Sequence, residues 1–196
     1  MVEPAPVPVI SELRTERLVL RTWRDDDLDA YAQLSADPRV MEYFPKTLSR
    51  DESDASAGRF RDHFAAHGFG MWAVEVPGAA PFIGFVGLCW VPFAAPFTPA
   101  VEIGWRLATE HWGRGYASEA ARAALAAGFD RLGLDEVVAM AMPDNLPSLR
   151  VMEKLGMQRS PSEDFLHPWV TDGGPKGLRV LYRISRAAWA SYQAMP

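Results

Sequence analysis

The chain has 196 residues, of which 48% are hydrophobic and 23% are charged, and this composition indicates one globular domain rather than a disordered chain. Its formal net charge of -5, with no run of lysine and arginine, argues against a protein that binds the backbone of nucleic acids. The single cysteine, Cys89, excludes an internal disulfide and a four-cysteine zinc site, and it is typical of a reducing cytoplasm.

The chain begins with "MVEPAPVPVI", which holds an acidic residue, three prolines and no cationic segment. This composition does not fit a signal peptide and favours an extended tail. We therefore predict a flexible, proline-rich tail over residues 1–11 and a single domain over residues 12–196, located in the cytoplasm.

The first half of the domain predicts one strand followed by two helices. "RLVLRTW" (17–23) is a short apolar strand, and residues 25–38 have acidic capping candidates and helical spacing before Pro38. A second helix is expected from Ser49 to about His67, because Ser49 and Glu52 have the spacing of a capping box and Gly68 follows.

A long apolar segment comes next, with no charged residue between Val76 and Val101. Prolines at positions 81, 92 and 96 would break a membrane-spanning helix, so we predict a buried strand over 83–90 followed by a proline-rich loop. Together with "GMWAVEV", this strand should form a hairpin.

The second half alternates strands and helices. "VEIGWRL" (101–107) has the alternation of a strand, and an alanine-rich helix follows to about residue 132. "EVVAMAM" (136–142) lacks alternation, which indicates burial on both faces. A short helix over 146–155, a last strand over 177–184 and a terminal helix complete an α/β fold with a β-α-β unit.

The segment "GRGYAS" (113–118) connects strand 101–107 to the alanine-rich helix. A helix N-terminus presents unpaired N–H groups and a partial positive charge, and glycines allow a phosphate to approach them. The motif alone leaves open that the glycines only shape a turn. The P-loop motif is absent, and Asp135 and Glu136 precede "VVAMAM" of the next strand, where a dinucleotide-binding fold would need its acidic residue after that strand.

Two longer segments, "VEIGWRL…EHWGRGYASEAARAALAAGF" and "MAMPDNLPSLRVMEKLGM", resemble the GNAT acetyltransferases, and most closely the branch of the RimJ/RimL ribosomal-protein N-acetyltransferases. The resemblance extends to "LRTERLVLRTW" and "DFLHP…VLYRIS", and so covers nearly the whole chain. It implies a mixed, mostly antiparallel sheet of about seven strands, with helices on both faces. Strands 101–107 and 136–142 would splay apart to hold acetyl-CoA.

The resemblance also implies which residues hold this cosubstrate. The pyrophosphate would lie on backbone N–H groups from Trp112 to Ala117, and the pantetheine arm would run beside residues 105–107. Trp112 departs from the glutamine or arginine that the family often has there, although RimJ/RimL-like members commonly carry an aromatic residue. The predicted cofactor-binding residues are Trp105, Arg106, Leu107, Trp112, Gly113, Arg114, Gly115, Tyr116, Ala117, Ser118 and Asn145.

Acetyl transfer to an amine needs a base for the amine, a donor for the oxyanion and an acid for the departing thiolate. Glu102 is the predicted base, acting through water, and a backbone N–H of strand 101–107 is the predicted oxyanion donor. The resemblance puts Ser148 near the cofactor sulfur, as general acid. Tyr116 and Tyr182 are weaker alternatives to Ser148. The sequence leaves open that Glu102 is a surface or salt-bridged glutamate and that Ser148 is an ordinary serine at a helix N-terminus.

The histidines of the sequence do not indicate a further cofactor. His63 and His67 have metal-ligand spacing but no evident third ligand, so we predict no metal. His167 lies in a long loop region, where it structures the loop or lines an acceptor site. The partner is an amine acceptor, either a small molecule or a protein N-terminus. We expect no nucleic acid, no membrane, and a monomer or homodimer. The alternative to an enzyme is a non-catalytic acyl-CoA-binding sensor or interaction domain.

Overall fold

The computed structural model describes residues 9–168, 170 and 177–194. Part of the expected tail belongs to the folded domain, which corrects the predicted boundary. Ile10 is fully buried, its N–H donates to the Gly68 carbonyl (2.7 Å), and its carbonyl accepts from the Trp72 indole (2.8 Å). Residues 1–8 of that tail lie outside the described residues.

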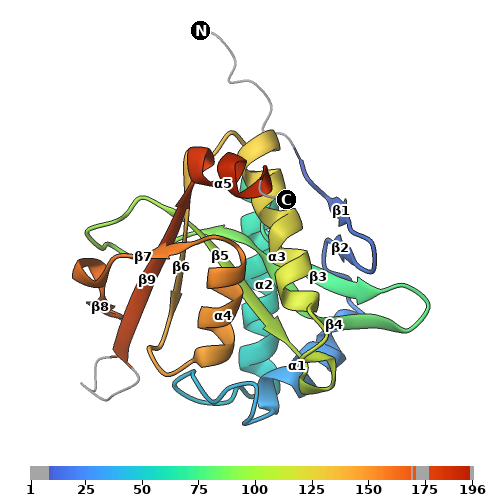
Figure 1. The fold of residues 1–196 in the computed structure, drawn as a ribbon. Coiled ribbons are helices and arrows are strands. Elements are labelled where there is room, and N and C mark those ends of the chain that lie inside the picture. Colours follow the sequence, from blue (N-terminus) through green and yellow to red (C-terminus); the bar gives the residue numbers. More distant parts are fainter. Residues whose placement is uncertain (1–8, 169, 171–176, 195–196) are drawn as a thin grey trace, which may run out of the picture.

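The molecule is built around one sheet (Figure 1). Neighbouring strands in this sheet are antiparallel except for one parallel pair, β5 and β6. Within the described residues the sheet has nine strands instead of the expected seven or so, because strands of only two or three residues add to the longer ones. The spatial order is β1 (Glu12–Arg14), β2 (Val19–Arg21), β3 (Met71–Val76), β4 (Ala80–Trp90), β5 (Val101–Leu107), β6 (Glu136–Ala141), β9 (Leu178–Ser185) and β7 (Gln158–Arg159), with β8 (Phe165–Leu166) also paired to β9.

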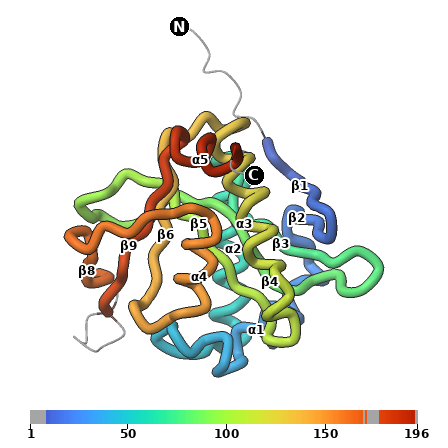
Figure 2. The backbone as a smooth tube through the Cα atoms, in the orientation of Figure 1, coloured from blue at the N-terminus to red at the C-terminus, as the bar shows by residue number. Residues whose placement is uncertain are grey.

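Helices cover both faces of this sheet, as Figure 1 shows, with α2 behind it and α3, α4 and α5 in front. The helices are α1 (Asp27–Ala36), α2 (Arg50–His67), α3 (Tyr116–Ala126), α4 (Leu146–Lys154) and α5 (Arg186–Gln193). A π turn, Ala127–Arg131, prolongs α3, and single 3-10 turns occupy Thr109–His111 and Pro161–Glu163. The tube in Figure 2 shows β1 and β9 near opposite sides of the molecule.

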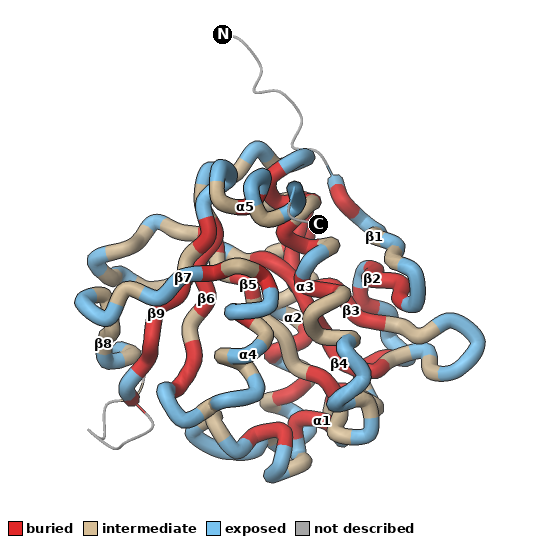
Figure 3. The backbone as a smooth tube through the Cα atoms, viewed as in Figure 1, coloured by how far each residue is buried: buried red, intermediate tan, exposed pale blue. Residues whose placement is uncertain are grey.

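The two faces of the sheet belong to two hydrophobic clusters. The larger one includes Ile103 and Leu107 of β5 and the fully buried Ala120, Ala121 and Ala124 of α3. These small side chains let α3 approach the strands closely. The smaller cluster packs Tyr31 of α1 and Ala57 of α2 against Phe85 of β4. The central strands are therefore buried while the connecting loops are exposed (Figure 3).

Local sequence determines the ends of α2 as predicted. Ser49 accepts from the Glu52 N–H (3.2 Å), and the Glu52 carboxylate accepts from the Ser49 N–H (2.9 Å). Gly68 then ends the helix at φ 73°, in the left-handed region that glycine tolerates. The capping box and the glycine cap are both confirmed.

The apolar segment after Val76 contains the second strand of a hairpin, as expected. Residues 83–90 lie in β4, and Ile83, Val86 and Leu88 are fully buried in the larger core. Among the described helices, none combines the length and the apolar character needed to cross a membrane.

Candidate active site

The loop of residues 112–115, here called the glycine loop, connects the turn after β5 to α3. Gly113 (φ 72°) and Gly115 (φ 81°) both have left-handed backbone conformations that side chains disfavour, and this is why glycine occupies both positions. Glu119 is the first residue of α3 whose backbone N–H is hydrogen-bonded to a backbone carbonyl, that of Gly115 (3.0 Å). The N–H groups of residues 116–118 therefore have no acceptor within the helix, and a helix end of this kind is suited to an anion.

Trp112 fixes the start of this loop. Its backbone N–H donates to the Thr109 carbonyl (3.1 Å), and its indole N–H donates to the Leu107 carbonyl (2.7 Å). Both donors are thus used inside the protein, and the N–H groups available to a phosphate start after Trp112. The indole ring itself is exposed beside the loop.

The parallel pair β5 and β6 opens as expected. Their only registered residue pair is Glu102 with Val138, at the start of β5. By contrast, β5 pairs with β4 along its whole length, from Val101 to Leu107. From Ile103 onward β5 therefore has a strand on one side only, and the edge toward β6 leaves backbone groups for a ligand. This splay leads directly to the glycine loop.

Glu102 lies where the two strands separate. It stands opposite Cys89 in β4, so its side chain lies on the face of the smaller hydrophobic cluster, away from α3. Removal from water raises the pKa of Glu102 to about 7, while the positive charge of Arg179 opposes this rise. A carboxyl group that exchanges its proton near neutral pH is suited to general base chemistry.

Arg106 shares this face of β5. Its guanidinium carbon lies 4.1 Å from the ring centroid of Phe44 and 5.3 Å from that of Phe85. Its Nε and Nη1 atoms are buried without a hydrogen-bond partner, and burial lowers the pKa of the group. The side chain is therefore directed toward the segment between α1 and α2, and only the backbone of Arg106 follows the open edge of β5.

The start of α4 follows β6 in the chain, after residues 142–145. Asn145 caps this helix, because its side-chain oxygen accepts from the Ser148 N–H (3.2 Å). Ser148, in the first turn, is partly buried. The predicted cofactor ligand and the predicted acid are thus held in one local motif.

The remaining candidates have structural contacts. Tyr182 lies in the larger hydrophobic cluster, where burial raises the pKa of its phenol, and Tyr116 packs under the guanidinium of Arg17. His63 bonds to the backbone at both ring nitrogens, at Phe69 and Trp90. His167 packs its ring on Phe93, at 4.7 Å between centroids. Within the described residues, no three histidine, cysteine or acidic side chains gather as a metal site.

Sequence reasoning missed two arginines near the site. Arg17 bonds to Glu119 and to the glycine loop, and Arg179 acts electrostatically on Glu102. Arg179 is itself buried at the start of β9 and is followed by two further buried residues, so no alternation along the strand could have indicated it. No local pattern could indicate Arg17, because its partner, Glu119, lies about a hundred positions later in the chain.

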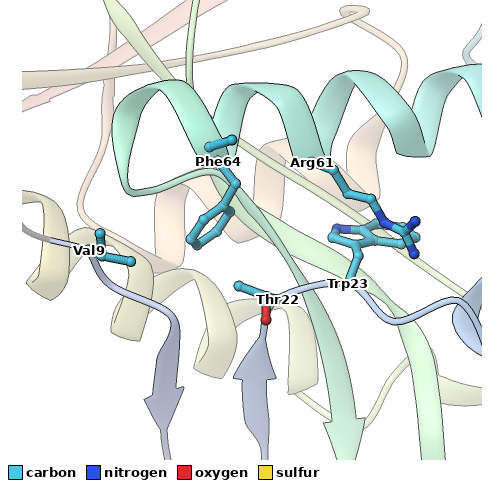
Figure 4. Close-up of a pocket in the computed structure, with 6 residues that line it drawn as sticks. Val9, Thr22, Trp23, Arg61 and Phe64 are labelled. Atoms are coloured by element: carbon cyan, nitrogen blue, oxygen red, sulfur yellow. The ribbon is translucent and has the colours of Figure 1, made fainter.

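A separate cavity of about 310 Å³ lies between the N-terminal segment and α2 (Figure 4). It is lined by Val9, Thr22, Trp23, Arg61, Phe64 and Ala65. Arg61 forms an ion pair with Asp25, at 2.9 Å. None of these residues is a predicted site residue, so this cavity is distinct from the splay.

Comparison with known proteins agrees with this geometry. Residues 17–158 match the acetyltransferase (GNAT) domain family. The N-acetyltransferase YnaD of Bacillus subtilis, itself uncharacterized, is 30% identical over 90% of this chain and 98% of its own. The structure of a GNAT-family acetyltransferase from Bacillus anthracis superposes with a TM-score of 0.73 and 26% identity, over 90% of this chain and 99% of that one.

The fold is also that of a ribosomal-protein-S5-alanine acetyltransferase from Vibrio fischeri, with a TM-score of 0.71 and 16% identity over 91% and 98% of the two chains. Together these findings define the class of the protein as a transferase of acyl groups. The chain belongs to the GNAT acetyltransferase family and is an N-acetyltransferase. Members of this family use acetyl-CoA as cosubstrate, which the glycine loop and the splay fit.

Proposed function

We propose that this protein transfers the acetyl group of acetyl-CoA directly to a primary amine, either a protein N-terminus or a small-molecule amine. One observation carries the proposal: the splay of β5 and β6 joins the N-terminal end of α3 to a carboxyl group whose pKa is near neutrality. A phosphate-bearing cosubstrate that followed this path would have its far end beside Glu102.

The glycine loop would hold the pyrophosphate. The donors are the N–H groups of Gly113, Arg114, Gly115, Tyr116 and Ala117, with the Ser118 hydroxyl nearby. The fit rests on the left-handed glycines, which turn the backbone without side chains, and on the unpaired first turn of α3.

The pantetheine arm would lie along Trp105, Arg106 and Leu107, on the strand edge that has no partner. Asn145 would contribute its side-chain amide N–H₂, because its oxygen already caps α4. Acetyl-CoA supplies the activated acetyl group as a thioester.

The protein's own groups would move the protons. Glu102 accepts the proton of the amine, through water, because an amine attacks only in its neutral form. A backbone N–H at the open edge of β5 stabilises the oxyanion. As the bond from the amine nitrogen to the acetyl carbon forms and the carbon–sulfur bond breaks, Ser148 donates a proton to the departing thiolate and regains one from water. Cys89 has no role as an acyl carrier, since burial strongly raises the pKa of its thiol.

The first test compares acetyl-CoA with NAD and ATP by thermal shift. A ligand at 100 times its dissociation constant stabilises the native protein by about 2.7 kcal/mol, so acetyl-CoA alone should raise the melting temperature clearly. Turnover with any amine then separates an enzyme from a non-catalytic acyl-CoA sensor.

Two matched variants locate the site. Gly113 and Gly78 have nearly the same left-handed conformation (φ 72° and 74°), and a Cβ atom added at either would meet nothing within 4 Å. Gly113→Glu should abolish the acetyl-CoA shift by placing a carboxylate in the glycine loop. Gly78→Glu, in the turn between β3 and β4, should cost similar stability and keep the shift. Equal shifts in both variants would refute the assignment.

A further inference from the structure

We infer that Arg17 is a positioning residue for the cosubstrate: with Glu119 it clamps the glycine loop, and it cancels the carboxylate charge that Glu119 places beside the pyrophosphate. This inference rests on the proposed function of the loop. It assigns a role to the turn between β1 and β2, far from the splay in sequence.

Glu119 is the centre of the clamp. One carboxylate oxygen accepts from the Thr15 hydroxyl (2.6 Å) and from the Arg17 N–H (3.0 Å). The other accepts from the Arg17 Nε (2.7 Å). The whole turn that holds Thr15 and Arg17 is therefore folded around one side chain of α3. Only 17% of the Glu119 side chain remains accessible, so its charge is poorly screened by water.

Arg17 also reaches the loop itself. Its Nη1 donates to the Arg114 carbonyl (3.0 Å), and its guanidinium carbon lies 4.9 Å from the ring centroid of Tyr116. A Cβ atom added to Gly115 would lie 3.4 Å from its Nη2. Arg17 thus bonds to Arg114 and packs on Tyr116, and its guanidinium lies beside Gly115 between them. These contacts hold the backbone whose N–H groups are proposed to bind phosphate.

The charge of Glu119 makes the arginine necessary. An acidic residue in the first turn favours the helix dipole, but it repels a phosphate bound at the same end. Partial burial opposes ionisation of Glu119, yet the hydrogen bonds from Thr15 and Arg17 outweigh it and lower the pKa of this carboxyl below its ordinary value. Glu119 therefore stays charged at neutral pH. Arg17, directly paired with it, removes the repulsion.

A purely structural anchor would behave differently. It would hold β1 and β2 against α3 and affect only the melting temperature. The clamp should in addition change the affinity for acetyl-CoA, and part of that change should depend on salt, since the repulsion from an uncompensated Glu119 is screened.

The experiment measures acetyl-CoA affinity by isothermal titration calorimetry on the full chain. The proteins are the wild type, Arg17→Gln, and the double variant Arg17→Gln/Glu119→Gln. Each is titrated at about 0.01 M and about 1 M salt, where the screening length is about 30 Å and about 3 Å. Arg14→Gln is the matched control, because Arg14 is an exposed arginine of neighbouring β1 that pairs with Glu12 (2.8 Å).

Arg17→Gln should raise Kd about tenfold at low salt and less at high salt. The double variant should bind more tightly than Arg17→Gln at low salt, because the unpaired carboxylate is gone. In steady-state kinetics Arg17→Gln should raise KM for acetyl-CoA and leave kcat nearly unchanged. Arg14→Gln should bind like the wild type.

Two results would overturn the inference alone. One is a wild type that binds acetyl-CoA while Arg17→Gln, checked for folding by circular dichroism, binds equally well. The other is a loss of acetyl-CoA affinity in Arg17→Gln that is the same at both salt concentrations and is also the same in the double variant. Failure of the wild type to bind acetyl-CoA would instead overturn the proposed function, and the inference with it.

Discussion

At the scale of single residues, Glu102 combines a cost in stability with its proposed role as the catalytic base. Its pKa in the folded protein is about 7, against an ordinary value of 4.5, because the fold removes it from water. The folded protein therefore holds this proton more tightly than the unfolded chain does. The stabilisation is fully present below pH 4.5 and is lost as pH rises through 7.

Glu102→Gln should separate these two effects. Removal of the ionisable group should change the free energy of unfolding differently at the two pH values. The change should be more favourable at pH 8 than at pH 5, by about 2 to 3 kcal/mol. Loss of the base should lower kcat/KM about 100-fold or more and remove its acidic limb near pH 7. Chemical denaturation at both pH values and a pH–rate profile test the two parts.

The control is Glu12→Gln, a change to an exposed strand glutamate of β1, which should keep wild-type turnover. If Glu102→Gln keeps both the rate and its pH profile, Glu102 is not the base. The face that Glu102 occupies was predictable from the alternation of residues 101–107. Its pKa was not, because burial of this face and the charge of Arg179 come from segments distant in sequence.

At the scale of elements, His63 connects the end of α2 to the end of β4. Its Nδ1 lies 2.9 Å from the Phe69 carbonyl, and its Nε2 accepts from the Trp90 N–H (3.1 Å). This pattern needs the neutral ring with the proton on Nδ1. Burial lowers the pKa of His63, and the nearby His67 adds to this.

Acidification should therefore weaken the connection between α2 and β4. Because the folded-state pKa is lowered, the unfolded chain binds the proton more readily, and the stabilisation present above pH 6.5 is lost as pH falls through the folded value. His63→Phe should lower stability at pH 8 and reduce its dependence on pH between 8 and 5.5. Melting temperatures of both proteins over this range provide the measurement. An undiminished dependence in the variant would show that His63 does not cause it.

Elements with a strong local signal were predictable. Strand 101–107 has the predicted bounds, and α2 begins at its capping box, because alternation and capping depend on neighbours in sequence. The splay of β5 and β6 came from the family resemblance. The short strands β7 and β8 were missed because two residues carry no periodicity, and their pairing with β9 defines them.

At the scale of the whole molecule, contacts between distant segments fix the parts that sequence could not indicate. Ile10 joins the core through Gly68 and Trp72, and Arg17 reaches across the sheet edge to Glu119. The glycine loop itself was predictable from "GRGYAS". The support that the loop receives from the turn between β1 and β2 was not predictable, because these hydrogen bonds join residues that are far apart in sequence and meet only in the folded protein.

A buried ion pair ties the N-terminal elements to the sheet in the same way. Arg21 of β2 and Asp27 of α1 make two hydrogen bonds of 2.8 Å, and both side chains are almost inaccessible. Arg21 also donates to Glu75 of β3 (3.0 Å) and to the carbonyl of Pro81 (2.7 Å). One guanidinium thus connects β2, β3, β4 and α1.

Removing one charged partner of this pair should lower the free energy of unfolding more than replacing both partners with apolar residues. Asp27→Asn leaves the buried Arg21 with Glu75 as its remaining counter-charge and should lower the free energy of unfolding by about 3 kcal/mol, the lower end expected when one partner of a buried pair is removed. The double variant Arg21→Met/Asp27→Leu, which fills the space with apolar groups, should lose less. Asp29→Asn is the matched control, because this exposed aspartate of the same helix pairs with Arg50 at the surface and should change stability little. Urea denaturation of the four proteins measures the difference. A double variant less stable than Asp27→Asn would mean that the pair stabilises the fold beyond the cost of burying its charges.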